Sequence, residues 1–219
     1  MKTTIILMIL ALFLSCKEHK VIVSTSIHTD SLLIGDALFY LDSISENEFK
    51  KIKTINQEND IDTSLVKVYP DSILIRTTIK NVVYKNDSTE GESMVSYEFR
   101  SIPTLGYVHI AGNHWEWTTD RYINIKNGSE TYFWANPVLS PNKQSLVAFS
   151  CDLEAGFMPN GIQLYTINAD TITQMLEKEI DNWGPEEVKW ESDTSLVIKR
   201  LRLDKDMQPK YDYLRLNIK

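Results

Sequence analysis

Two stretches of the chain, fifty residues apart, decide its fold class. Residues 138–149 read VLSPNKQSLVAF, and residues 188–199 read VKWESDTSLVIK. Each consists of an apolar run, a short polar segment and a second apolar run, the pattern of two strands joined by a tight turn. A shorter echo, VKVYPDSILIR, occupies residues 66–76. Similar segments that recur along the chain predict a structural unit that the chain uses more than once.

The sequence around the first copy extends this unit. A polar loop at 152–160, an apolar run at 161–167, a short turn at 168–170 and a run beginning at Thr171 follow it. Four antiparallel strands in this order form a blade of a β-propeller. Residues 65–68, 73–79, 82–84 and 94–99 are also rich in β-branched and aromatic types. We therefore predict one all-β domain of antiparallel sheets over residues 21–219, with propeller-like repeats at about 134–200.

The turn in the first copy carries a resemblance. NPVLSPNK, at residues 136–143, is similar to the Ser-Pro-Asp-Gly turns in the propellers of the Tol-system periplasmic protein and the prolyl-oligopeptidase class. Lys143 stands where those turns have glycine, and the second copy lacks the proline. Such turns serve geometry rather than chemistry. The resemblance implies a small or an incomplete propeller, because a mature chain of about 200 residues at ~45 per blade allows four or five blades.

Three local signals predict particular elements. Ser45 followed by Glu48 has the form of a capping box and predicts a short helix over 45–54. Asn127-Gly128 is a strong hairpin signal between two apolar runs. Gly112-Asn113 is a weaker one. As a two-residue loop it would pair Ile110 with Trp115 and place the apolar side chains of both strands on one face.

The same register would bring three polar side chains together. His109 would lie across from Glu116, and His114 would lie diagonal to His109. Two imidazoles and a carboxylate could ligate a divalent metal or form an acid/base pair. They could equally form an ordinary cross-strand pair on a polar sheet face. We favour this second interpretation because no metal-site spacing motif accompanies the three residues.

The loop at 152–160 offers two further candidates. Phe157 and Met158 are apolar residues at a loop tip and are candidate contacts for a partner. Asp152 and Glu154 could hold calcium, although a solvated loop accounts for them more simply. The five tryptophans could form a sugar-binding platform. We expect instead that Trp115, Trp117, Trp134 and Trp190 pack in the core and that Trp183 lies at a turn, at the edge of a sheet.

The N-terminus has the features of an export signal. Lys2 precedes an apolar run of ten residues, IILMILALFL, at 5–14, too short for a membrane span. Leu14-Ser15-Cys16 follows and resembles the lipobox of bacterial lipoprotein precursors, from which only Phe13 departs. The resemblance implies a signal peptide at 1–15, a lipid on Cys16 and a short tether at 16–20. Cys151 is then left without a disulfide partner, as an inert buried thiol near a strand end.

The charge excludes some partners. Without the leader, which holds Lys2, 22 Lys and Arg stand against 30 Asp and Glu, a net charge of −8 that disfavours nucleic acid. Lys17-Glu18 partly resembles a surface-export signal of bacterial lipoproteins, although His19 does not fit it. We predict a lipid-anchored protein of the cell envelope, on the outer membrane, facing either the periplasm or the cell surface.

The sequence indicates a function only in outline. It contains no Gly-x-Ser-x-Gly, glycine-rich phosphate loop, Cys-x-x-Cys or His-Glu-x-x-His, and it predicts no cofactor. The leading hypothesis is a non-enzymatic binding or assembly module for a protein or a glycan. The alternative is an envelope hydrolase or metal-dependent enzyme that uses His109, His114 and Glu116.

Overall fold

Four antiparallel sheets make up almost all of the structure. The computed structural model describes residues 30–34, 37–53, 63–101, 106–135, 137–168 and 171–218. The first sheet contains β3 (Val66–Val68), β4 (Ser72–Arg76) and β5 (Asn81–Lys85). The second contains β6 (Val95–Ser101), β7 (Tyr107–His114), β8 (Thr118–Asn124) and β9 (Glu130–Phe133). The third contains β10 (Val138–Leu139), β11 (Ser145–Ser150), β12 (Gly161–Asn168) and β13 (Thr171–Glu179).

The fourth sheet joins the beginning of the described chain to its end. It runs in the order β1 (Asp30–Ile34), β2 (Ala37–Ile44), β16 (Pro209–Asn217), β15 (Ser195–Leu203) and β14 (Gly184–Ser192). β2 pairs with β16 through Leu41 and Leu216. The remaining elements are α1 (Glu46–Lys51), which packs against this sheet, and a 3-10 turn, η1 (Thr63–Leu65).

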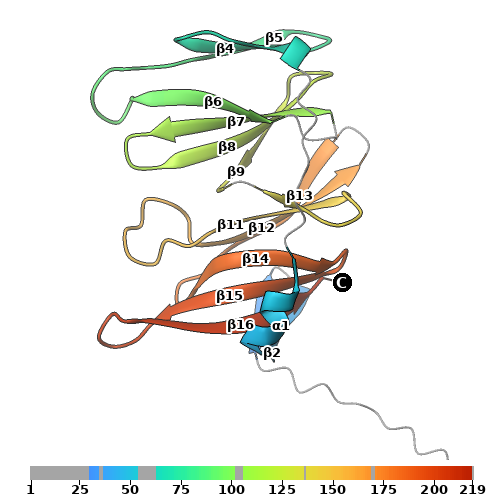
Figure 1. Ribbon diagram of the computed structural model, residues 1–219, viewed down its shortest axis with the longest axis vertical. Helices are drawn as coiled ribbons and strands as arrows, with labels where there is room; N and C mark the ends of the chain where they lie inside the picture. The colour runs from blue at the N-terminus through green and yellow to red at the C-terminus, as the bar shows by residue number, and fades with distance from the viewer. Residues whose placement is uncertain are drawn as a thin grey trace, which may run out of the picture.

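The sheets form an open row. Figure 1 shows them stacked in chain order along the long axis, with β4 and β5 at one end and β16 and β2 at the other. The first and last sheets therefore do not meet to close a ring. All-β architecture with antiparallel sheets and one short helix is confirmed, whereas the propeller-like arrangement stays a prediction. No helix among the described residues has the length and hydropathy of a membrane span.

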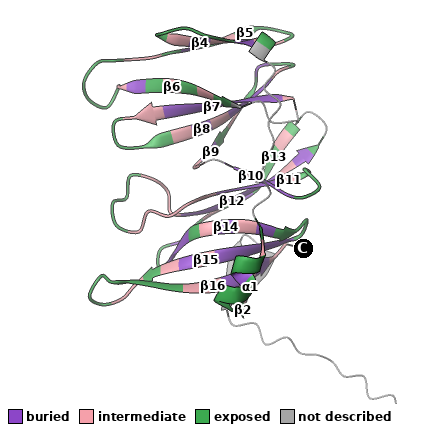
Figure 2. Cartoon of the chain, in the orientation of Figure 1, coloured by how far each residue is buried: buried purple, intermediate pink, exposed green. Residues whose placement is uncertain are grey.

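Burial follows from the stacking (Figure 2). Leu146, Val147 and Ala148 of β11 are all fully buried, although neighbouring side chains of a strand point to opposite faces. β11 lies in an inner sheet, so another sheet covers each of its faces. The unbroken apolar run of the first copy is thus explained by burial on both sides, and Leu196, Val197 and Ile198 of the second copy are fully buried as well.

The two copies of the repeat form the same unit with different registers. β10 and β11 form one hairpin, and β14 and β15 form the other, as predicted. Val138 pairs with Val147, but Val188 pairs with Ile198, one residue beyond the equivalent position. The second turn is tighter and its strand is bulged, which accounts for the shift. The turns also touch, since the Asn142 amide donates a 2.8 Å hydrogen bond to Asp193.

Lys143 shows why the related turns carry glycine. Its φ is +60°, in the left-handed region that glycine adopts without strain. The Asn127-Gly128 hairpin has the same requirement, since Gly128 has a φ of +71° in the connection between β8 and β9. That prediction is confirmed, although the connection is longer than two residues.

The predicted helix is confirmed and is shorter than expected. Ser45 accepts a hydrogen bond from the Glu48 amide at 3.2 Å, and Glu48 accepts one from the Ser45 amide at 2.8 Å. This reciprocal pair satisfies two backbone donors that the helix itself leaves open. Phe49, 3% exposed, anchors the helix by packing against Tyr213, with 5.1 Å between ring centroids.

The predicted turn at Gly112-Asn113 is wrong. β7 continues through both residues to His114, and the chain reverses at Trp115 and Glu116. Gly112 serves close packing instead. A Cβ atom there would lie 2.6 Å from Thr119 Oγ1, so only glycine fits in mid-strand. The expected register between residues 107–111 and 114–118 is therefore absent.

Candidate ligand-binding groove

The three residues of the predicted polar cluster do not come together. His109 is 2% exposed, and its Nε2 lies 2.5 Å from Asp120 Oδ1 on β8. His114 is five residues further along β7, so its side chain leaves the other face of the strand. Glu116 is exposed in the turn. Within the described residues no three His, Cys, Asp or Glu side chains are placed to hold a metal ion.

A large hollow lies between the second and third sheets. It has a volume of about 790 Å³ and is bounded by the β7–β8 turn, β9, the loop at 157–159 and parts of β12 and β13. This volume is within the ~300–1,000 Å³ of ordinary ligand pockets. Its aromatic lining consists of Trp117, Tyr132, Phe133, Trp134, Phe157 and Tyr165.

Trp117 is held as a flat platform in the lining of this groove. Its indole stacks on the His114 imidazole, with 3.6 Å between ring centroids and 3° between planes. It remains 40% exposed. Burial, and then the positive charge of Arg121, lower the pKa of His114 below its usual range, so a neutral imidazole supports the indole at neutral pH. The neighbouring Trp115 is 62% exposed but does not line the groove.

Tyr132 is fixed in a comparable way. The Arg121 guanidinium lies over the Tyr132 ring, 4.7 Å from its centroid, and also contacts Tyr84 and Tyr97 at 5.6 Å and 5.5 Å. A guanidinium over an aromatic face is a favourable electrostatic contact. The Tyr132 side chain nevertheless remains 54% exposed. Both rings are therefore ordered before a ligand arrives.

A set of hydrogen bonds ties the two sheets together beneath the rings. Gln163, 3% exposed, accepts from the Trp134 amide at 2.9 Å and donates to Glu177 at 2.7 Å. Tyr165 donates its hydroxyl to the Tyr132 carbonyl at 3.0 Å. The Tyr132 carbonyl on the free edge of β9 and the Trp134 amide just beyond it are thus already paired. This edge is closed at those positions to the addition of a strand from another chain.

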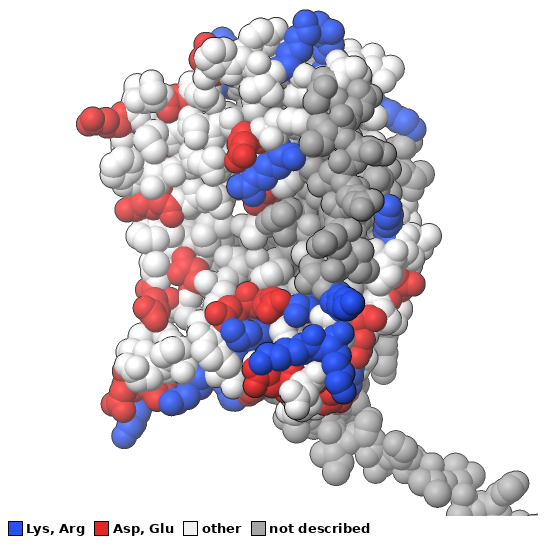
Figure 3. All heavy atoms as spheres, viewed as in Figure 1, with Lys and Arg blue, Asp and Glu red and all other residues white. Residues whose placement is uncertain are grey.

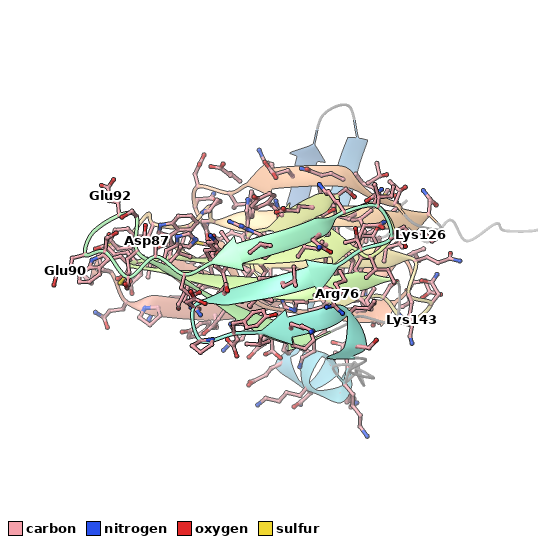
Figure 4. All side chains as sticks on the ribbon, turned by 90° about the horizontal axis from the view of Figure 1, so that it is seen from above. Arg76, Asp87, Glu90, Glu92, Lys126 and Lys143 are labelled. Carbon is pink, nitrogen blue, oxygen red and sulfur yellow. The ribbon has the colours of Figure 1, made fainter. Side chains whose placement is uncertain are left out.

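The groove carries negative charge only. Glu130 and Glu177 belong to its lining, which contains no Lys, Arg or His. Asp87, Glu90 and Glu92 lie at one end of the strands and Arg76, Lys126 and Lys143 at the other (Figure 4). β6 begins beside the end of β7, which places the acidic end next to the turn that carries Trp117. An anionic ligand would therefore be repelled from both the groove and its approach.

The loop at 152–160 is organised by one carboxylate. Asp152 accepts hydrogen bonds from the amides of Ala155, Gly156, Phe157 and Met158, at 2.8–3.0 Å. These bonds lower the pKa of Asp152, the Met158 amide most strongly. The carboxylate is thus occupied by the backbone rather than available to calcium. Phe157, 54% exposed, and Met158 both line the groove, which places the predicted partner-contact residues at a hollow.

The structure corrects the expected positions of the tryptophans. Trp183 and Trp190 are 5% and 4% exposed and belong to the same core. Trp115 and Trp117, expected in the core, lie instead in the exposed β7–β8 turn. The Trp-Glu-Trp sequence was the signal for an exposed aromatic turn at this place. The neighbouring Gly-Asn pair has the stronger turn composition and therefore led to the wrong prediction. Trp134 lines the groove.

Of the two cysteines, only Cys151 lies among the described residues. Cys151 is a free, half-buried thiol that follows β11. Burial, together with nearby Glu186 and Asp152, raises its pKa, in agreement with an unreactive thiol. Cys16 and the rest of the predicted leader and tether lie outside the described residues.

The comparisons with known proteins add no name to this site. No protein-family model matches the chain, and neither a curated protein nor a solved structure matches it. Its chemistry is therefore inferred from the groove itself.

Proposed function

We propose that this protein is an exported, lipid-anchored binding protein that holds a neutral glycan in the groove without transforming it. The observation that carries the proposal is the indole of Trp117, stacked on His114 and still exposed at the groove. A ring fixed in advance loses little freedom when a ligand covers it, and this favours binding.

The mixture of rings and polar groups suits sugars. A sugar ring has an apolar C–H face, which packs on an aromatic face, and a rim of hydroxyl groups, which need hydrogen-bond partners when they leave water. The groove supplies both, since Gln174, Glu177 and Thr131 line it beside the aromatic side chains. The carboxylates and the acidic approach argue against uronic acids and phosphorylated sugars.

A binding role suits the groove better than catalysis. Glu177 accepts hydrogen bonds from the amides of Gln163 and Gln174, at 2.7 Å and 3.0 Å, and so acts as an acceptor within the scaffold. The alternative hypothesis, an enzyme, requires His109, His114 and Glu116 to lie together in one patch, and the observed register separates them. We therefore do not retain it.

The lipid on Cys16 would hold the groove near a membrane. Thirteen residues lie between Cys16 and Asp30, the first residue of β1, and the fourteen steps along the chain, at no more than ~3.6 Å each, reach about 50 Å. β1 belongs to the sheet at one end of the row (Figure 1), whereas the residues that line the groove belong to the second and third sheets. Anchoring at that end would leave the groove accessible.

Calorimetry with neutral oligosaccharides tests the glycan role. The mature chain would be titrated with cello-, malto- and laminari-hexaose, and with an oligogalacturonate as the anionic comparison. We expect one neutral series to bind and Trp117→Ala to weaken it about tenfold, since an aromatic contact contributes roughly 1–1.5 kcal/mol. Trp115→Ala, in the same turn but outside the groove, is the matched control and should bind normally.

Two results would refute this role. One is the absence of binding for all three neutral series. The other is equal affinity in Trp117→Ala and the wild type, with thermal unfolding showing that both are folded. Tighter binding of the galacturonate would overturn the charge argument.

A separate experiment tests the anchor. The full chain and Cys16→Ser would be expressed in a bacterium that processes lipoproteins, and membranes would be separated from soluble envelope proteins. The wild type should be found with the membranes and carry acyl chains detectable by mass spectrometry. Cys16→Ser should lose both properties, and its retention on the membrane would contradict lipid anchoring.

A further inference from the structure

A second hollow adjoins the groove on the far side of the same loop. It has a volume of about 490 Å³ and lies among the loop at 152–160 and residues 179–181, where β13 ends. Phe157, Met158 and Pro159 line both hollows. These three residues therefore form a ridge between two neighbouring depressions rather than the boundary of one.

The ridge is held firmly from below. The four amide hydrogen bonds to Asp152 fix the backbone from residue 155 to residue 158. At the other end of the loop, Asn160 donates through Nδ2 to the carbonyls of Ile180, at 2.5 Å, and Trp183, at 2.9 Å. A ridge supported in this way does not need to order itself around a ligand.

The two hollows differ in chemistry. The groove exposes more apolar than polar surface and has six aromatic side chains. The second hollow exposes more polar surface, and its apolar members are Leu153, Ile180 and the three ridge residues. The carboxylate of Asp152 is already occupied by amides. The side chains of Glu179 and Asp181, by contrast, are exposed and make no hydrogen bond or ion pair among those the structure records for the described residues. They are free to accept hydrogen bonds from hydroxyl groups.

We propose that the two hollows are successive subsites for one glycan chain, which crosses the ridge over Phe157. This inference rests on the proposed function, because it assigns the second hollow to the continuation of the same ligand. The aromatic groove stacks the first sugar units, and the polar hollow receives later units through their hydroxyl groups. Phe157, 54% exposed, offers its ring to the unit at the crossing.

The consequence is a dependence of affinity on chain length. A ligand confined to the groove gains nothing from units beyond those the groove can contact. A ligand that continues across the ridge gains contacts with each added unit until the second hollow is filled. Linking two weak sites through one ligand raises affinity because binding at the second site becomes intramolecular.

The experiment measures affinity along one homologous series. The mature chain would be titrated by calorimetry with the di- to octasaccharides of the neutral series that binds. The variant Glu179→Ala/Asp181→Ala removes the free acceptors of the second hollow. Glu90→Ala/Glu92→Ala is the matched control, because both acids are exposed at the same end of the strands but line neither hollow.

We expect wild-type affinity to rise at least tenfold between the disaccharide and the longest oligosaccharides. In Glu179→Ala/Asp181→Ala the disaccharide should bind as in the wild type, while most of the gain with length is lost. The control should match the wild type at every length. Phe157→Ala should weaken the long oligosaccharides more than the disaccharide.

Three outcomes would overturn the second subsite. Affinity could be independent of length, the Glu179/Asp181 variant could keep the full gain, or it could lose disaccharide and octasaccharide binding equally. In each case the proposed glycan role would survive if Trp117→Ala still weakened binding. Failure of every oligosaccharide to bind would instead refute the proposed function and this inference with it.

Discussion

Two of the three junctions in the row bury their sheets with different side chains. Between the third and fourth sheets the core is aliphatic apart from two tryptophans; it comprises Leu41, Val147, Ile162, Leu164, Leu176, Ile180, Trp183, Val188, Trp190, Leu196, Ile198, Leu214 and Leu216. Between the second and third sheets, half of the core side chains are aromatic; it comprises Tyr107, Tyr122, Phe133, Leu139, Leu146, Ala148, Tyr165 and Ile167.

This difference explains where the groove lies. Branched aliphatic side chains interdigitate and fill the space between two sheets, as in the core of any small domain. Tyrosines carry hydroxyl groups that need partners, and the aromatic junction accordingly includes the bond from Tyr165 to Tyr132 and the bridge through Gln163. We infer that the aliphatic junction contributes more to stability. The aromatic junction packs less completely and leaves a surface that can bind a ligand.

The largest expected effect comes from the aliphatic junction. Leu196 is fully buried, and Leu196→Ala should lower the free energy of unfolding by about 2–5 kcal/mol, because it removes apolar contact and leaves a cavity. Urea unfolding followed by circular dichroism measures the loss. Met175→Ala, at a residue 54% exposed, is the control and should change stability by less than about 0.5 kcal/mol. Equal losses in the two variants would contradict the packing described here.

A smaller loss is expected in the second sheet, behind the groove. Asp120 is 3% exposed and faces His109. Asp120→Ala leaves the buried imidazole without this partner and should cost about 1–3 kcal/mol in the same unfolding measurement. Asp120→Asn keeps an oxygen beside the ring and should cost less. If the asparagine variant were the less stable of the two, the hydrogen bond would not be the stabilising contact.

The fourth sheet should determine part of the acid sensitivity. Charged side chains of both signs gather over this end of the molecule (Figure 3). Asp212 accepts two hydrogen bonds from Arg200, both 2.8 Å, and the Arg200 guanidinium is the main cause of its lowered pKa. Because the folded pKa lies below the unfolded one, the stabilisation is complete above about pH 5 and is lost as the pH falls through the folded value.

Asp212→Asn should therefore flatten the fall in stability below about pH 4. The contribution is about 1 kcal/mol or less, since the carboxylate is more than a third exposed and partly screened by water. Thermal unfolding of the wild type and the variant between pH 7 and pH 3 measures it. Asp206→Asn, in the turn beyond β15, is the control and should follow the wild type. Parallel curves for Asp212→Asn and the wild type would remove this pair as a source of acid sensitivity.

The smallest effect on stability is expected at the groove. Trp117 contributes a stacked but exposed ring, and Trp117→Ala should lower the free energy of unfolding by less than about 1 kcal/mol while it weakens glycan binding. Thermal unfolding of the variant measures the first effect. A loss comparable to that of Leu196→Ala would show that Trp117 is a core residue. The contrast between the two junctions would then fail.

Local signals in the sequence were sufficient where the physics is local. The capping box of Ser45 and Glu48 lies within one helical turn, and the conformation that Gly128 adopts depends on its own backbone. The strand–turn–strand repeat was also recognisable, because its apolar runs are long. In all three cases neighbouring residues supply most of the interactions that select the structure.

Predictions failed where the answer depended on distant residues. Gly112-Asn113 has the composition of a turn, but Thr119 and Tyr97 press against Gly112 and require a glycine within the strand. The chain therefore reverses at Trp115 and Glu116, and His109 lies beside Asp120 instead of Glu116. A shift of this kind changes which side chains face one another along the whole hairpin.

The sequence by itself thus determined an all-β chain with one capped helix and two related hairpins, because propensity, turn chemistry and apolar periodicity act over a few residues. The tertiary structure alone decided which residues form the groove. Trp117, Phe157 and Gln163 come from a turn, a loop and a strand of two different sheets. Only the stacking of those two sheets brings the three residues together. This stacking depends on how buried side chains, far apart in the sequence, fill the space between the sheets.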